Sequence, residues 1–145
     1  MFKHLLVPTD GSTLSAKAVQ AAVSFAKEAG ARITALSVAE PFPYSALSES
    51  AFLPDQTRYE QQMQDHAKRY VDEVAEIART AGVPCETRVA LSFSPYEEIV
   101  RLAQEKGCDA IFMASHGRKG LNRLFVGSET QKVLAHSNLP VMVFR

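Results

Sequence analysis

Short apolar runs alternate with longer segments of helical periodicity along this chain. The apolar runs predict five strands, at Phe2 to Val7, Arg32 to Val38, Cys85 to Leu91, Asp109 to Ala114 and Val141 to Phe144. The helical patterns predict four helices, at Ser12 or Thr13 to Ala29, Tyr59 to Ala81, Ser94 to Gly107 and Ser128 to His136. Strands that alternate with helices of this length form parallel sheets with helices on both faces. We therefore predict an α/β fold with an open five-stranded parallel sheet, in one domain spanning residues 1–145.

Two junctions carry further local signals. Glu40 to Thr57 contains three prolines and no clean period, which predicts a long loop. Ser94-Pro95-Tyr96-Glu97 has a hydroxyl, a proline in the first turn and a glutamate three residues after the serine. That pattern is typical of a helix start with a serine N-cap.

Charge and composition limit the classes of partner. The 145 residues include sixteen basic and sixteen acidic side chains, so no broad basic face for duplex nucleic acid is implied. No window approaches a membrane span, and the N-terminus lacks a signal-like apolar stretch. Cys85 and Cys108 form no C-x-x-C pair and are interpreted as small buried thiols in a reducing compartment. We expect a cytoplasmic protein that binds neither nucleic acid nor membrane.

The stretch from Met113 to Thr130 is the strongest functional signal. An apolar strand ends in Ser115-His116-Gly117, a loop follows, and Gly127-Ser128 stands where a helix begins. The loop also contains Gly120 and the cations Arg118, Lys119 and Arg123. Uncovered amides at a helix start and nearby positive charge favour anions, phosphate above all. The alternative is that the glycines only permit turns and the cations are solvated.

Three polar clusters follow predicted strands. They are Pro8 to Ser12, Val38 to Pro41, and Ser115 to Gly117. In open α/β sheets, ligands bind beyond the carboxyl ends of the strands, where the strand order reverses. If the first and fourth strands are neighbours there, the clusters converge on one crevice that fits a nucleotide. Asp10 could instead be a simple turn residue or an N-cap.

The chain resembles the universal stress protein family over nearly its whole length. The resemblance rests on the opening strand followed by PTDGS, and on the signature G-x2-G-x9-G-[ST] of the ATP-binding branch. Here Ala114 replaces the first glycine of that signature, while Gly117, Gly127 and Ser128 match it. The resemblance implies a Rossmann-like sheet, similar to the adenine nucleotide alpha hydrolases, with strand order 3-2-1-4-5.

The resemblance also assigns roles to residues. Pro8, Thr9 and Asp10 would flank the adenosine, with the carboxylate on the ribose or a metal-bound phosphate, and Val38 would meet the adenine through its backbone. Met113 and Ala114 would line the floor of the site. The residues that would surround the phosphates are His116, Gly117, Arg118, Lys119, Gly120, Gly127, Ser128, Glu129 and Thr130. For Glu129, stabilisation of its own helix dipole is the preferred alternative.

The function expected from this resemblance is a regulatory stress-response module. It would bind ATP or another adenine nucleotide, with Mg²⁺ arriving on the nucleotide, and dimerise through Val141 to Phe144. The alternatives are a slow ATPase or phosphotransferase, and a stress protein that acts by dimerisation without nucleotide. We expect no catalytic residues, since no G-x4-G-K-[ST] loop or Ser-His-Asp arrangement is apparent. No His or Cys spacing suggests a metal site of protein ligands.

Overall fold

The structure is a computed structural model that describes residues 1–43, 53–117 and 126–145. Within these residues the chain forms strands and helices in strict alternation. Their bounds are β1 His4–Pro8, α1 Thr13–Ala29, β2 Arg32–Ala39, α2 Leu53–Ala81, β3 Cys85–Leu91, α3 Pro95–Glu105, β4 Ala110–Ala114, α4 Ser128–His136 and β5 Val141–Phe144.

The strands form one sheet in the order β3-β2-β1-β4-β5. Every pair of neighbours is parallel, with Leu5 opposite both Ile33 and Ala110 in the centre of the sheet. The predicted α/β class, the parallel sheet and the strand order are confirmed. Each of the first four strands is followed by a helix that returns the chain to the end of the sheet where the strands begin, which is why all the carboxyl ends lie together.

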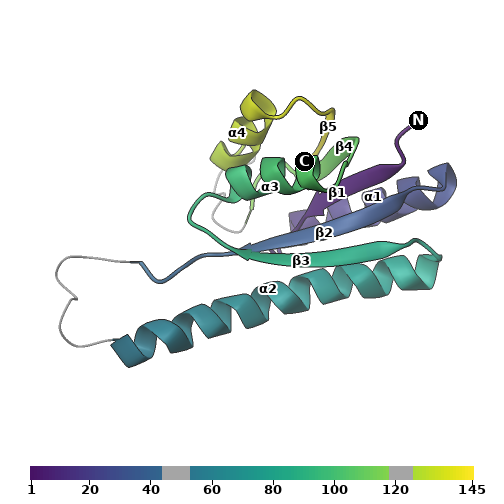
Figure 1. Cartoon of the computed structure of the whole chain (residues 1–145). Helices are drawn as coiled ribbons and strands as arrows, with labels where there is room; N and C mark the ends of the chain where they lie inside the picture. The colour runs from purple at the N-terminus through teal and green to yellow at the C-terminus, as the bar shows by residue number, and fades with distance from the viewer. Residues whose placement is uncertain (44–52, 118–125) are drawn as a thin grey trace.

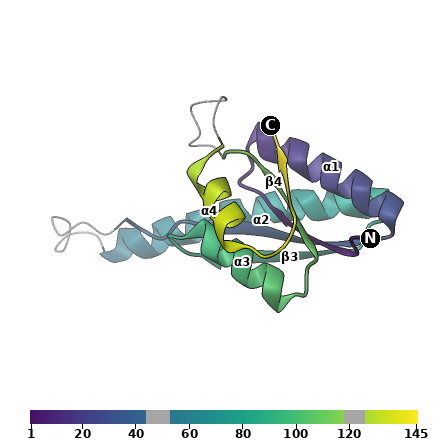
Figure 2. The same cartoon turned by 90° about the horizontal axis from the view of Figure 1, so that it is seen from above.

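Two apolar cores lie on opposite faces of the sheet. One contains Leu5, Val7 and Phe112 of the strands with the inner faces of α1 and α2. The other contains Leu6 and Ile111 with the inner faces of α3 and α4. Figure 1 shows the long helix α2 below the sheet and α3 and α4 above it, and Figure 2 shows α3 and α4 from above. Successive residues of β1 and β4 enter opposite cores, because the side chains of a strand alternate between the two faces of the sheet.

Two of the sequence predictions differ from the structure. The first concerns the long loop, because α2 begins at Leu53 and so takes in the end of Glu40 to Thr57. Pro54 falls in the first turn, where a helix tolerates proline because that amide has no intrahelical partner. The second concerns Ser94, which occupies the N-cap of α3 but makes no side-chain capping hydrogen bond.

Candidate functional site

The order of the strands reverses between β1 and β4. The chain leaves β1 for α1 on one face of the sheet, and it leaves β4 for α4 on the other face. The two connections therefore diverge from adjacent strand ends, and we call the region between them the crevice because it is the place where open α/β sheets bind ligands. Two of the three polar clusters predicted from the sequence border this crevice directly.

The first cluster is a tight turn that holds itself in shape. The Ser12 amide donates to Asp10 Oδ1 at 3.0 Å, and the Gly11 amide donates to Thr9 Oγ1 at 3.2 Å. The Ser15 hydroxyl donates to Thr9 Oγ1 at 2.8 Å, and the Thr9 amide donates to Leu36 O on β2 at 2.8 Å. Ser12 is the N-cap of α1 and accepts from the Ser15 amide. Asp10 is thus a turn residue whose first carboxylate oxygen is oriented by the backbone.

The second carboxylate oxygen of Asp10 faces the other loop. An ideal β-carbon built on Gly117 would overlap Asp10 Oδ2 and lie 3.4 Å from its Cγ. Gly117 does not have a positive φ, so its backbone conformation does not itself demand glycine. The requirement is space for the carboxylate of Asp10. The loops after β1 and β4, more than 100 residues apart in sequence, therefore meet at this point.

The loop after β4 is tied to the start of α4. The Gly127 amide donates to Ser115 O at 2.7 Å, and the Thr130 hydroxyl donates to Ala114 O at 3.0 Å. A β-carbon on Gly127 would lie 3.1 Å from Ser115 O and from His116 Cβ. Gly127 therefore favours the close approach of the two backbone segments, which a β-carbon would press apart by a few tenths of an ångström.

These bonds engage two groups of the expected set of phosphate donors. The Gly127 amide and the Thr130 hydroxyl were both expected to donate to a ligand, but each already donates within the protein. Gly127 is the N-cap of α4 and makes no side-chain capping bond. A helix leaves its first amides without intrahelical partners, so the amides of the first turn and the exposed Ser128 hydroxyl are the donors at this end of the crevice.

Val38 lies where the backbone of β2 extends past the end of β1. Leu36 O accepts from Thr9, whereas Ala39 O accepts from Ser92 beyond β3. Because the backbone groups of a strand alternate in direction, the amide and carbonyl of Val38 point to the β1 side. Within the described residues, the β1–β2 ladder ends at the Thr9 bond. The Val38 backbone therefore faces the crevice, as expected for contact with a base.

Met113 and Ala114 were expected to line the floor of the site, but their side chains point to opposite faces of the sheet. The Met113 side chain is 6% exposed and belongs to the core under α3 and α4, so only its backbone is near the crevice. Ala114 has the same strand parity as Ala110 and Phe112, whose side chains enter the core under α1 and α2. Its methyl group therefore points towards α1. His116 Nδ1 lies 3.0 Å from the Ser115 hydroxyl.

Glu129 faces helix α3. Its Oε2 accepts a 2.9 Å hydrogen bond from the Tyr96 amide, and its Oε1 lies 3.2 Å from Lys132 Nζ. The Tyr96 amide is in the first turn of α3, so Glu129 performs the capping that the sequence assigned to Ser94. Glu129 lies in the first turn of α4, where its charge suits the helix dipole as the sequence suggested, and its carboxylate also joins α3 to α4.

Three of the expected phosphate-binding residues, Arg118, Lys119 and Gly120, lie outside the described residues. The described part of the chain holds no group of three or more His, Cys, Asp or Glu placed to bind a metal ion. Over the same part, no helix combines the length and apolar character needed to cross a bilayer.

Several residues of this region were not singled out by sequence reasoning. Ser15 supports Thr9, Tyr70 of α2 packs on Gly11, and Tyr96 donates its amide to Glu129. Ser15 has a weak sequence signal, since a hydroxyl three residues after a serine N-cap lies in the first helical turn. Tyr70 and Tyr96 carry no such signal because their partners are 59 and 33 residues away.

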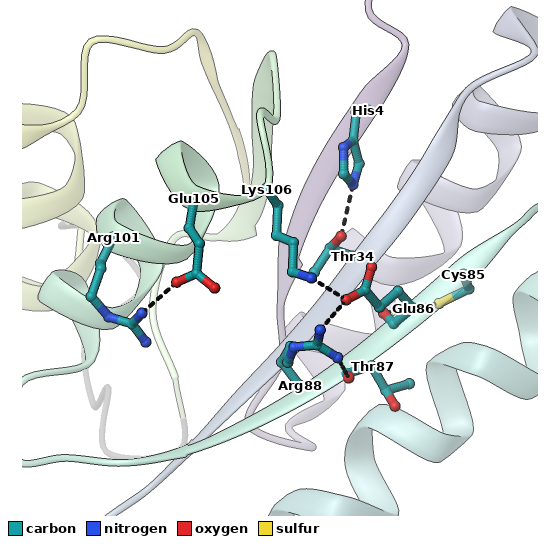
Figure 3. A network of polar contacts seen from close by, with 9 residues as sticks. All are labelled: His4, Thr34, Cys85, Glu86, Thr87, Arg88, Arg101, Glu105 and Lys106. Carbon is teal, nitrogen blue, oxygen red and sulfur yellow. Dashed lines mark hydrogen bonds and ion pairs between the residues drawn. The ribbon is translucent and has the colours of Figure 1, made fainter.

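A second polar cluster occupies the opposite, amino-terminal edge of the sheet (Figure 3). His4 Nε2 lies 2.7 Å from Thr34 Oγ1, and Glu86 pairs with Lys106 and Arg88 at 2.5 Å each. Burial, and secondarily the charge of Arg32, lowers the pKa of His4, and among the residues that the structure describes its buried Nδ1 has no hydrogen-bond partner.

Cys108 belongs to the same edge, and burial raises the pKa of its thiol to about 11. Cys85 is half-buried, which corrects the expectation of a fully buried thiol. The raised pKa disfavours a reactive thiol at this edge, because thiol reactivity requires the thiolate.

Comparison with known proteins agrees with this architecture. The model of the universal stress protein family matches residues 1–145, and the chain belongs to that family. It is 35% identical over 151 residues to the universal stress protein YxiE of Bacillus subtilis, with all of both chains covered. It is 30% identical over 148 residues to the universal stress protein MJ0531 of Methanocaldococcus jannaschii, covering all of this chain and 83% of the relative.

Solved structures of the family share the fold. UspA from Lactobacillus plantarum superposes with a TM-score of 0.87 at 26% identity, over 99% of this chain and 98% of that one. A universal stress protein solved in complex with cAMP gives a TM-score of 0.72 at 24% identity, over 99% and 97% of the two chains. The protein from Archaeoglobus fulgidus in complex with dAMP gives 0.69 at 18% identity, over 100% and 98%.

Proposed function

We propose that this protein binds an adenine nucleotide in the crevice between β1 and β4 and acts as a regulatory stress-response module. The observation that carries the proposal is the meeting of Asp10 and Gly117 across the switch point, beside an α4 N-terminus whose N-cap is a glycine. This arrangement combines a carboxylate for ribose hydroxyls with backbone amides for phosphate, which are the two groups a nucleotide presents.

Each part of the nucleotide has a counterpart in the crevice. The Val38 backbone faces the base, Asp10 faces the ribose, and Ser128 with the first-turn amides of α4 faces the phosphates. The expected cations Arg118 and Lys119 follow Gly117 in the chain and belong to the proposal on sequence grounds. The family members solved with cAMP and dAMP support an adenine nucleotide as the ligand class.

We propose ATP as the ligand, with Mg²⁺ carried by its phosphates. Mg²⁺ is commonly held by one or two carboxylates together with phosphate oxygens rather than by a protein cage. Asp10 fits that requirement, because its Oδ2 faces Gly117 and the loop that would surround the phosphates. Bound there, the ion would neutralise phosphate charge next to the carboxylate.

We further propose a homodimer formed through β5, which is one of the two edge strands of the sheet. Ser115 donates to Phe144 O and Ile111 donates to Pro140 O, so the even-numbered residues bond to β4. The amides of Val141 and Val143 therefore point away from the sheet, and Met142 is 49% exposed. No other strand of the described residues pairs with this edge, and such an edge with apolar side chains is a template for a second copy related by a two-fold axis.

The proposed role is regulatory rather than catalytic. Hydrolysis would need a base aligned with an attacking water, and the carboxylate of Glu129 is held by the Tyr96 amide of α3. We expect ATP turnover below about 1 per second, the lower edge of ordinary enzymes. We place the protein in the cytoplasm, in keeping with two free cysteines.

The test is to identify nucleotide that co-purifies with the native protein by mass spectrometry, and to titrate the stripped protein with ATP, AMP and cAMP. We expect an adenine nucleotide in the preparation and micromolar binding that Asp10→Ala weakens by at least about tenfold. Ala114→Gly should change the affinity by less than about threefold, because the Ala114 methyl points towards α1. Absence of adenine nucleotide binding by the folded protein would overturn the proposal.

A further inference from the structure

Tyr70 of α2 packs directly on the turn that carries Asp10. A β-carbon built on Gly11 would lie 2.5 Å from Tyr70 Cδ1 and 2.7 Å from Cζ, and closer still to Cε1. Real β-carbons do not approach other heavy atoms this closely, so the Cδ1–Cε1–Cζ side of the ring occupies the space that a side chain at position 11 would need. Gly11 also has a φ of 75°, in the left-handed region that favours glycine.

The turn between β1 and α1 has supports on its other sides as well. Thr9 is tied to β2 through Leu36, and Ser12 is tied to Asp10 and caps α1. The ring of Tyr70 closes the remaining side, from a helix that follows β2 rather than β1. The position of the Asp10 carboxylate opposite Gly117 therefore depends on the packing of α2.

We propose that Tyr70 is a positioning residue of the nucleotide site, which fixes the Asp10–Gly11 turn so that the carboxylate stands opposite Gly117. The inference rests on the proposed function for its ligand, but the packing that it invokes is a property of the protein alone. The ring acts through Gly11 and makes no contact with the nucleotide.

The packing is tested first by NMR without ligand. A ring over Gly11 shifts the α-proton resonances of that residue, and we expect Tyr70→Ala to abolish the shift and to move the amide resonances of Asp10 and Gly117. Tyr70→Phe retains the ring and should preserve all three. Val74→Ala is the matched control, because Val74 lies one turn further along α2, is 2% exposed and belongs to the core. It should lower the melting temperature and leave the Gly117 resonance in place.

A double-mutant cycle tests the same contact by steric relief. Gly30 has a φ of 64° and nothing within 4 Å of an added β-carbon, so Gly30→Ala measures left-handed strain alone. We expect Gly11→Ala to lower the melting temperature more than Gly30→Ala does in the wild-type background. In the Tyr70→Ala background the two losses should become equal. If Gly11→Ala and Gly30→Ala lower the melting temperature equally in both backgrounds, the packing argument is overturned.

The binding arm is a titration of ATP against the same variants. Tyr70→Ala, and Tyr70→Leu as a variant that keeps apolar bulk, should weaken binding by at least about tenfold, while Tyr70→Phe should stay within about threefold. Wild-type affinity in folded Tyr70→Ala, or an equal loss in Val74→Ala, would overturn the positioning role. If the wild type binds no adenine nucleotide, the proposed function fails, and the resonances of Asp10 and Gly117 still decide whether Tyr70 fixes the turn.

Discussion

Gly117→Ala adds one methyl group at the point where the two loops meet. The methyl would overlap Asp10 Oδ2 and lie 3.4 Å from Asp10 Cγ. The carboxylate must withdraw by about 1 Å to restore an ordinary contact distance. Because the obstacle is the end of a side chain and the backbone conformation suits alanine, the loss of stability should stay below about 1 kcal/mol.

The effect on nucleotide affinity should be much larger than the effect on stability. A hydrogen bond to a charged group contributes about 1.5 to 3 kcal/mol, so a displaced Asp10 carboxylate predicts about a 10- to 150-fold rise in the ATP dissociation constant. Isothermal titration measures that constant, and circular dichroism during thermal unfolding measures stability.

The double variant Asp10→Ala with Gly117→Ala separates this mechanism from a general disturbance of the loop. If the methyl acts by moving the carboxylate, Gly117→Ala should add almost nothing once Asp10 is already alanine. Independent, multiplicative losses would refute the reasoning, as would wild-type affinity in the single Gly117→Ala protein.

Three further predictions follow from other contacts. Val143→Pro removes an amide that points away from β4, so we expect a folded monomer by light scattering at micromolar concentration. A dimer that persists in this variant would contradict the β5 interface. Glu129→Ala leaves the Tyr96 amide uncapped and should cost about 1 kcal/mol in urea unfolding with ATP affinity within about threefold, whereas a tenfold loss of affinity would instead make Glu129 a ligand contact. The pKa of His4 is lowered from 6.5 by burial and by Arg32, against the opposing charges of Asp109 and Glu86. The unfolded chain therefore binds the proton more readily, and stability should fall as the pH drops below about 6.5. His4→Gln should reduce this pH dependence. If the dependence persists in that variant, His4 is excluded as its source.

The local pattern of the sequence contains most of the fold. Strand and helix periods, and glycines such as Gly30 at the helix ends, depend on residues a few positions apart, so they can be recognised without the tertiary structure. The predicted start of α2 was wrong because the prolines before it are typical of a loop. One of them, Pro54, occupies the first turn of the helix. The strand order, expected from the resemblance, is confirmed.

The sequence also indicated which clusters belong to the candidate site, since Asp10, Gly117 and Gly127 stand at strand ends or a helix start. Only the tertiary structure decided what each group does there. The Gly127 amide and Thr130 hydroxyl are taken by the β4 loop, Glu129 caps α3, and Tyr70 supports Gly11. The physical reason is that a hydrogen-bond donor or a packing surface is available only if no distant residue already occupies it, and separation along the chain does not reveal which distant residues the folded sheet brings into contact.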